Sequence, residues 1–534
     1  MCMSPYRILK WSPGVYLWPK RRKSQDRFTT SIRMRSLSRS NEPAEVFMKT
    51  IPTALLLLCF WCFALSARAG TSEPLFQVRV NGQPLDLHEF LQGAFGQFEL
   101  AQPVEVEIQA AFDVRWVEVR PKSAGITPVI GSDHQTIRFQ LRSARPVTVE
   151  FNDDLAQVLH LFAYPPEKDP PQPGAPNVRY FGPGIHEAGL IELKDGETLY
   201  LAPDSWVKGN VRSIGTRNVV IRGRGILDGS EVGRKTARQS SSASGTAAVP
   251  AYAAGNDNMI YLQGTAGATV EGITIFNSSH WTLYARSTRG THIDGVRILN
   301  SSVNYGNDGI DLVSSSDVLV ENVFVRTNDD CVVVKNLDDV ETKNILVRRA
   351  VLWNMPTGGN ALEIGFEMRN RTAANIRFED IDIIHVERGS AISIHNGDAA
   401  TVEDVVFDDI RVEDARRKLI DFTVLYAQYG LDRPATQEER DRRMDRGGVW
   451  DGAQRFTSDE RPQRAKFRGH VRNVRVSNLN VIEGALPYSI VAGFDGEHAV
   501  ENVVVEGLQY QGRPIRTAAE GKFVLDHAPG FEIK

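Results

Sequence analysis

Polar and apolar residues alternate in the first part of the chain with the period of a β-strand. Residues 72–165 contain short segments in which every second residue is apolar, with turn residues between them. These segments are 76–80, 104–108, 114–119, 136–141 and 147–151. The pattern predicts a small β-sandwich. A proline-rich stretch from Pro165 to Gly174 follows, and it indicates a linker to a second domain.

The sequence beyond the linker is a loose repeat of strand, polar break and strand. It recurs at 268–279, 291–302, 316–329, 343–354, 374–386 and 401–414. Apolar residues roughly 23 to 30 positions apart are expected at equivalent points of the repeat, namely Ile273, Val296, Val323, Val351, Ile381 and Ile410. A repeat of this length that is built of strands predicts a β-solenoid, in which each coil buries its apolar face on its neighbours.

Two stretches interrupt the repeat. Residues 235–257 are rich in Ser, Ala and Gly and are expected to form a loop. Residues 415–468 contain the charged run 438–443, for which we expect a short solvated helix on a long excursion. Insertions of this kind either wall a substrate groove or are plain surface loops, and the sequence leaves both open.

The beginning of the chain has the pattern of a secretory signal peptide. An apolar run from Ala54 to Leu65 follows Met48 and Lys49, and it ends in an A-x-A site at 67–69. We interpret Met48 as the true start and 1–47 as a spurious extension, the alternative being a basic N-terminal arm. The expected parts are 1–47, the signal peptide 48–69, the sandwich 70–165, the linker 166–176 and the solenoid 177–534.

Removal of the leader changes the charge of the protein. The whole chain has a net charge of −4, and the first 69 residues carry nine net positive charges, which leaves −13. An acidic protein binds nucleic acid poorly, so no nucleic-acid partner is expected. Cys331 is the one cysteine outside the leader, so no disulfide framework is expected despite the export signal. We expect a secreted or periplasmic protein without membrane attachment after cleavage.

Three carboxylates carry the candidate chemistry. Asp308 is followed 21 and 22 residues later by the pair Asp329 and Asp330. This spacing excludes neighbours on a helix or in a hairpin, but one coil of a solenoid would bring the three side chains together. Like charges at close range push one another's pKa values apart, so that one group keeps its proton while another is ionised. Hydrolysis of a glycosidic bond requires that difference.

The motifs around these residues resemble the polygalacturonase family of glycoside hydrolases. Asn-Asp-Gly at 307–309 and Asn-Asp-Asp-Cys at 328–331 are similar to the family's motifs, as are the segments 180–186, 198–202 and 223–229. The resemblance implies a right-handed parallel β-helix and hydrolysis with inversion. It also implies that Asp329 is the general acid, and that Asp308 and Asp330 orient and deprotonate the attacking water. We interpret Asp311 as structural or supporting.

The sequence departs from that family where the substrate would be bound. Asn360 stands in place of the histidine of a Gly-His-Gly motif, and Ser393-Ile394-His395 stands in place of an Arg-Ile-Lys motif. An acidic sugar is recognised by an Arg/Lys clamp, and neither of these cations is present at the corresponding positions. Glu363 adds a further acidic side chain nearby. The plan of a sandwich followed by a β-helix resembles the dextranase and isopullulanase family, whose members cut neutral α-glucans. A neutral α-glucan is therefore favoured, with a pectic substrate as the alternative.

Further residues are candidates for contacts with the substrate. Trp281 and Tyr305 are expected to stack on sugar rings or to pack internally. Lys335, Asn360, Glu363 and His395 are candidates because they lie near the motifs. No cluster has metal-ligand spacing and no phosphate loop appears, so no metal or cofactor is expected. We expect a monomer whose partner is a polysaccharide. A polysaccharide lyase ranks lower because no cationic base is evident, and a non-catalytic binding solenoid ranks lower because it would have no reason to place three aspartates at this spacing.

Overall fold

The computed structural model of the chain describes residues 74–232, 257–300, 306–369, 371–427, 429–432 and 461–534. The predicted signal peptide, residue Tyr305 and the charged run 438–443 lie outside these residues. Glu73–Lys534 forms one compact unit. Its described part is almost entirely β, with one 3₁₀ turn, η1 (Lys122–Ala124), and one short helix, α4 (Arg461–Ala465). Neither has the length and apolarity of a membrane span.

The first part of the unit is a β-sandwich of two five-stranded sheets. One sheet has the order β2-β1-β5-β8-β7, and the other has the order β3-β4-β10-β9-β6 with β4 and β10 parallel. The strands are β1 (Phe76–Val80), β2 (Gln83–Leu85), β3 (His88–Phe90), β4 (Gly93–Glu99), β5 (Val104–Ala110), β6 (Val117–Arg120), β7 (Val129–Ile130), β8 (Thr136–Leu141), β9 (Pro146–Phe151) and β10 (Val158–Tyr164). Alternating apolar residues of the two sheets face one another and form the core between them.

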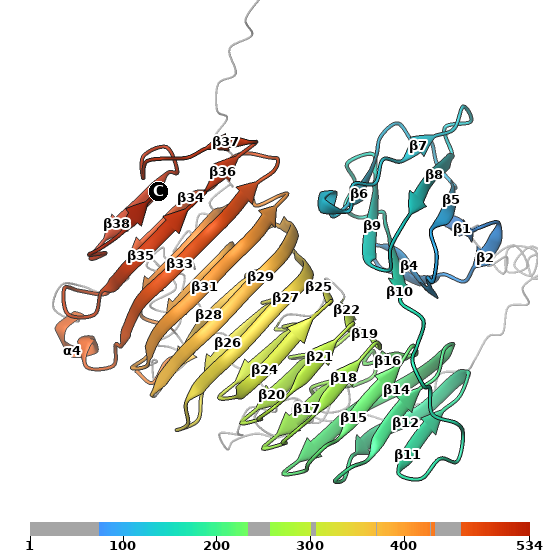
Figure 1. The fold of residues 1–534 in the computed structure, drawn as a ribbon, viewed down its shortest axis with the longest axis horizontal. Coiled ribbons are helices and arrows are strands. Elements are labelled where there is room, and N and C mark those ends of the chain that lie inside the picture. The colour runs from blue at the N-terminus through green and yellow to red at the C-terminus, as the bar shows by residue number, and fades with distance from the viewer. Residues whose placement is uncertain (1–73, 233–256, 301–305, 370, 428, 433–460) are drawn as a thin grey trace, which may run out of the picture. The chain divides into compact units, whose positions relative to one another are not determined.

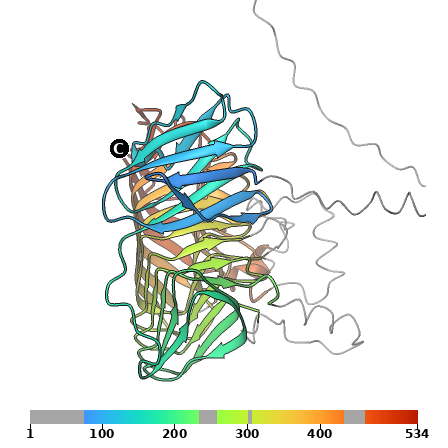
Figure 2. The same ribbon diagram turned by 90° about the vertical axis from the view of Figure 1, so that its right-hand side faces the viewer.

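The second part is a right-handed parallel β-helix whose coils stack with every strand beside its equivalent in the next coil (Figures 1 and 2). Three parallel sheets run along it. The first sheet contains the C-terminal halves of β12 (Gly184–Glu192) and β14 (Ser205–Ile214), then β17 (Ile260–Gln263), β20 (Leu283–Arg286), β23 (Ile310–Val313), β26 (Val332–Asn336), β28 (Leu362–Met368), β30 (Ser390–Asn396), β32 (Lys418–Val424), β34 (Tyr488–Ala492) and β38 (Phe523–Asp526).

The second sheet contains β11 (Val178–Phe181), β13 (Thr198–Leu201), β15 (Val220–Gly223), β18 (Thr269–Glu271), β21 (His292–Asp294), β24 (Ser316–Glu321), the N-terminal parts of β27 (Thr342–Asn354), β29 (Thr372–Val386), β31 (Thr401–Val412) and β33 (His470–Val481), then β35 (Val500–Glu506) and β39 (Glu532–Ile533). The third sheet contains the N-terminal halves of β12 and β14, β16 (Ile226–Asp228), β19 (Thr274–Phe276), β22 (Arg297–Leu299), β25 (Phe324–Thr327), the C-terminal parts of β27, β29, β31 and β33, then β36 (Gln509–Tyr510), with β37 (Arg513–Pro514) antiparallel at the end.

The inner core of the β-helix consists of stacked aliphatic rows, as the repeat predicts. Ile273, Val296 and Val323 occupy one inward row at equivalent positions. The predicted member Val351 is wrong by one residue, because the register pairs Phe324 with Val351 and therefore places Ala350 in that row. Ile381 and Ile410 then continue the row.

The outer face of the third sheet is apolar as well. Large side chains of the sandwich pack on it, and the shared cluster includes Phe95, Phe162, Tyr164, Phe324 and Trp353. Because this face is covered, β9 and β10 are buried along their whole length. A strand that is buried on both faces does not need to alternate. β9 keeps an alternating sequence at 147–151 although it is buried, but β10 does not alternate, and for that reason the pattern failed to predict β10.

Candidate functional site

The coil geometry brings the three aspartates together at one edge of the first sheet. Asp308 lies just before β23, and Asp329 and Asp330 lie just before β26. These two strands are direct neighbours, with Ile310 opposite Val332. The two turns are also bonded to each other, because the amide of Gly309 donates to the carbonyl of Asp330 at 2.8 Å. Residues one coil apart in sequence are thus adjacent in space.

Amide and hydroxyl side chains fix the backbone of the turn that carries Asp329. Thr327 Oγ1 donates to the Asp329 carbonyl at 2.7 Å, and Asn354 Nδ2 donates to the same oxygen at 3.0 Å. In the preceding coil, Asn307 Oδ1 accepts from the amide of Asn328 at 3.0 Å. Backbone groups of the turn that would otherwise lack partners are satisfied in this way, which stabilises the turn.

Gly359 packs directly against the Asp329–Asp330 peptide. Its φ is +69°, and a Cβ at this position would lie 2.2 Å from the carbonyl carbon of Asp329 and 2.4 Å from the nitrogen of Asp330. No side chain fits at such distances, and the positive φ also favours glycine. The close approach lets the following coil support the turn from one side.

Burial and mutual repulsion change the protonation of the paired aspartates. Burial and the charge of Asp308 raise the pKa of Asp329 to about 8. Burial, together with Asp329 and Glu363, raises the pKa of Asp330 well above its usual range. The amide and the side-chain Nδ2 of Asn360 both donate to Asp330 Oδ1, at 2.7 and 3.0 Å. Asp329 therefore keeps its proton at neutral pH, and the pKa of Asp330 is raised in the same direction.

Lys335 lies close to three acidic groups, including Asp308. Its Nζ lies 3.1 Å from Asp308 Oδ2, 3.4 Å from Asp311 Oδ1 and 3.9 Å from Glu367 Oε2. It also lies 3.8 Å from the ring centre of Trp281. Burial disfavours the ammonium, but Asp308 and the other carboxylates outweigh it and raise the Lys335 pKa well above its usual range. Burial and Asp308 raise the pKa of Asp311 well above its usual range.

A second buried charge network continues along the first sheet. His395 Nδ1 bonds to the Glu363 carboxylate at 2.9 Å, and His395 Nε2 lies 3.0 Å from Asp421 Oδ2. Burial opposes protonation of His395, but Glu363 and Asp421 raise its pKa to about 9. Ser393 Oγ also bonds to Glu363, and Lys418 bonds to Asp421. The imidazolium is therefore held by carboxylates on both nitrogens.

The predicted contact residues take up different places in this arrangement. Lys335 and Trp281 lie beside Asp308, and Asn360 lies beside Asp330. Glu363 and His395 lie one and two coils further on, where both are buried. Tyr305 lies outside the described residues.

Three groups that the sequence argument did not select also belong to the site. Glu367 approaches Lys335, Asp421 completes the His395 pair, and Asn354 holds the Asp329 turn. A signal for one of them existed in the sequence. Asp311, Glu363 and Asp421 occupy the same outward position of first-sheet strands, which a register alignment of the repeats would reveal.

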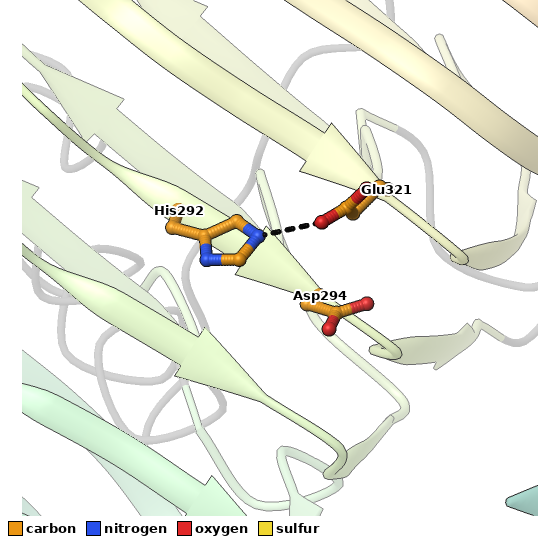
Figure 3. Close-up of side chains that lie close together, drawn as sticks. All are labelled: His292, Asp294 and Glu321. Carbon is orange, nitrogen blue, oxygen red and sulfur yellow. Dashed lines mark hydrogen bonds and ion pairs between the residues drawn. The ribbon is translucent and has the colours of Figure 1, made fainter. Parts of the chain in front are cut away.

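A separate acidic group lies on the second sheet. His292 of β21 points toward Glu321 of β24, and Asp294 of β21 lies beside them (Figure 3); the possible ligand atoms of the three residues lie within 4.8 Å of one another. His292 Nε2 bonds to Glu321 Oε1 at 3.0 Å. The other Glu321 oxygen, Oε2, already binds Arg348 and Arg349. Because two guanidinium groups neutralise the carboxylate, the cluster gives no specific indication of a metal ion.

The β-helix is similar to known proteins. Residues 195–436 match the model of Glycosyl hydrolases family 28. A curated relative, "Probable endopolygalacturonase C" of Aspergillus aculeatus, is 26% identical over 110 residues, which are 20% of this chain and 26% of that protein. The chain thus spans about a quarter of the length of this relative.

Two solved structures are similar in fold. Dex49A from Penicillium minioluteum has a TM-score of 0.57 at 16% identity, and the match covers 83% of each chain. An exopolygalacturonase from Thermotoga maritima has a TM-score of 0.48 at 18% identity, with 67% of this chain and 83% of that chain covered. The first similarity extends over most of both chains and supports the fold as a whole.

Proposed function

Because residues 195–436 match the model of Glycosyl hydrolases family 28, we propose that the chain is a glycosidase that cleaves the O-glycosidic bonds of a neutral polysaccharide with inversion. Asp329 protonates the leaving oxygen as the general acid. Asp308 deprotonates the attacking water, and Asp330 orients it. An inverting glycosidase needs one carboxylic acid and one carboxylate on opposite sides of the scissile bond.

The different surroundings of neighbouring carboxyl groups, a raised pKa at Asp329 and an ion pair at Asp308, carry this proposal. The pKa of Asp329 is about 8, so this group keeps its proton at neutral pH and can deliver it. Asp308 Oδ2 instead forms an ion pair with the Lys335 ammonium at 3.1 Å. The raised pKa of Asp330 favours a hydrogen-bonding role toward the water over a role as the base.

The charge balance around these residues supports a neutral sugar. Among the described residues, each cation of the network is already bound to carboxylate, and carboxyl groups outnumber cations by seven to three. The carboxyl groups are Asp308, Asp311, Asp329, Asp330, Glu363, Glu367 and Asp421, and the cations are Lys335, His395 and Lys418. If the three carboxyl groups with raised pKa values, Asp311, Asp329 and Asp330, each keep a proton, four carboxyl groups still face three cations. A uronate would meet repulsion here, since an acidic sugar needs an unpaired Arg or Lys.

The residues that replace the Arg-Ile-Lys clamp also support a neutral sugar. His395 stands where a lysine would hold a sugar carboxylate, and Glu363 and Asp421 bind its two ring nitrogens. The single hydroxyl proton of Ser393 is shared between Glu363 and the carbonyl of Leu362. Neither residue has a free cationic donor to offer to an acidic ligand. We favour an α-glucan among neutral polymers because the sandwich and β-helix plan resembles that of dextranases and isopullulanases.

A pectic substrate is the second candidate. It is favoured by the match to Glycosyl hydrolases family 28 and by a curated relative whose name is "Probable endopolygalacturonase C". This relative is matched over only 110 residues, so its substrate does not transfer by similarity alone. For either substrate we propose a secreted or periplasmic monomer that needs no cofactor, with the segment 48–69 as its export signal.

The proposal is tested by release of reducing sugar from dextran, pullulan, polygalacturonate and rhamnogalacturonan, with and without EDTA. We expect the wild type to cleave a neutral glucan, and we expect EDTA to have no effect. Cleavage of polygalacturonate alone would transfer the proposal to the pectic candidate. An unsaturated product whose formation EDTA abolishes would refute hydrolysis and indicate a lyase.

A further inference from the structure

His160 joins the sandwich to the β-helix behind the aspartates. It lies on β10, is completely buried and contacts a polar group on each side. Its Nε2 lies 3.0 Å from Nη1 of Arg326 on β25, and its Nδ1 lies 2.9 Å from Thr148 Oγ1. Arginine can only donate, so Nε2 accepts and the ring proton sits on Nδ1. Burial and Arg326 hold the pKa of His160 well below its usual range, which keeps the ring in this neutral form.

Arg326 depends on this acceptor. Only 2% of its surface is exposed, and within the described residues no carboxylate lies within salt-bridge distance of it. Its guanidinium stacks over the rings of Trp353 at 4.2 Å and Phe90 at 5.3 Å. Burial lowers the Arg326 pKa to about 9. A buried cation of this kind is costly without a hydrogen-bond acceptor, so His160 determines where the guanidinium lies.

The residues next to Arg326 and Trp353 bind the turn that carries Asp329. In the β25–β27 ladder, Arg326 is opposite Trp353 and Thr327 is opposite Asn354. The second of these pairs supplies both side-chain donors to the Asp329 carbonyl, at 2.7 and 3.0 Å. One ladder pair therefore contacts the sandwich, and the next pair contacts the backbone of the proposed general acid.

We propose that His160 is a positioning residue for catalysis, and that the sandwich acts through the Arg326–Trp353 pair to fix the turn that presents Asp329. The inference rests on the proposed role of Asp329. It explains why a hydrolytic β-helix carries a sandwich on its third sheet at the level of these two strands. The sandwich residue touches neither substrate nor reacting atoms. Its effect is on the geometry of the acid, and a misplacement of about 1 Å can cost roughly 100-fold in rate.

The test compares two substitutions of His160 on whichever polysaccharide the wild type cleaves. His160→Leu removes the acceptor, and we expect kcat to fall roughly tenfold or more with KM within about twofold. His160→Gln can place its side-chain oxygen where Nε2 lies, and we expect it to recover most of kcat. If both variants lose kcat equally, or if only KM changes, the acceptor does not position the acid and the proposal is overturned.

Tyr164→Phe is the matched control, since Tyr164 lies on the same strand and its hydroxyl bonds to Thr274 Oγ1 at 3.0 Å, at the level of a coil that carries no aspartate of the site. We expect a lower thermal midpoint with unchanged kcat. Equal loss of kcat in Tyr164→Phe and His160→Leu would mean that any weakening of the interface suffices, which contradicts a specific role.

A milder variant guards against failure of His160→Leu to fold. Thr148→Val removes only the partner of Nδ1, and we expect a smaller drop in kcat with KM unchanged. A Thr148→Val enzyme with wild-type kcat, together with a folded but inactive His160→Gln, would refute the proposal. A failure of the proposed function gives a different result. If Asp329 is not the general acid, Asp329→Asn keeps its activity, whatever the His160 variants do.

Discussion

Replacement of Asp329 by Asn should remove catalysis and at the same time increase stability at alkaline pH. The native pKa of Asp329 is about 8, whereas the unfolded chain has its ordinary value of 3.8. Between these values the native state binds more protons than the unfolded state, so stability falls as the pH rises through this window. An asparagine has no proton to lose. The variant should therefore match the wild type near pH 4 and exceed it near pH 9.

The size of the effect follows from the pKa. Each tenfold change in proton affinity is worth about 1.4 kcal/mol, so the ionised side chain costs the native state roughly 6 kcal/mol at pH 9. Asp329 is partly exposed, and water and local relaxation reduce this to about 2 to 3 kcal/mol. Unfolding entropy of about 2 cal/mol/K per residue gives about 1 kcal/mol per degree for Glu73–Lys534. We expect a thermal midpoint about 2 to 3 °C above that of the wild type at pH 9.

The assay pairs thermal unfolding at pH 4.5, 7 and 9 with release of reducing sugar. Asp317→Asn is the control, because hydrogen bonding by Asn344 and Arg289 lowers the pKa of that exposed carboxylate. The control should keep full activity and show no gain with rising pH. An Asp329→Asn protein that cleaves like the wild type, or whose advantage in thermal midpoint does not grow with pH, would refute the assignment of the acid.

Three further variants probe the surroundings of the acid. In Lys335→Met the pKa of Asp329 should rise further, so the alkaline limb of the kcat/KM profile should move to higher pH while the maximum falls roughly tenfold or more. Gly359→Ala should displace the turn and lower kcat about 100-fold, measured on a protein whose circular dichroism is unchanged. Arg120→Met should leave Glu413 at the interface without its guanidinium partner and cost about 3 to 5 kcal/mol in denaturant unfolding, with little change in KM.

The hydrophobic pattern predicted the fold because strand period and repeat length are local properties of the sequence. Rows of aliphatic residues such as Ile273, Val296 and Val323 stack as the repeat predicts. The error at Val351 has a simple cause. Ala350 fills the inner row, whereas the larger Val351 faces the sandwich, and apolarity alone cannot distinguish an inner core from a covered outer face.

The aspartate group could be predicted from spacing, but its supporting network could not. Asp308 and Asp330 are one coil apart, and the solenoid period is sufficient to bring them together. The contact of His160 with Arg326 spans 166 residues and depends on how the sandwich docks on the third sheet. Such docking is decided by the shapes of two surfaces, which no periodic pattern records.

The anomeric configuration of the first product tests the central claim most directly. During early hydrolysis of a soluble α-linked glucan, proton NMR distinguishes the two anomers of the new reducing end before they equilibrate. An acid at Asp329 and a water activated by Asp308 predict that the β-anomer appears first. Initial formation of the α-anomer would show retention through a covalent intermediate and would contradict the roles proposed for these aspartates.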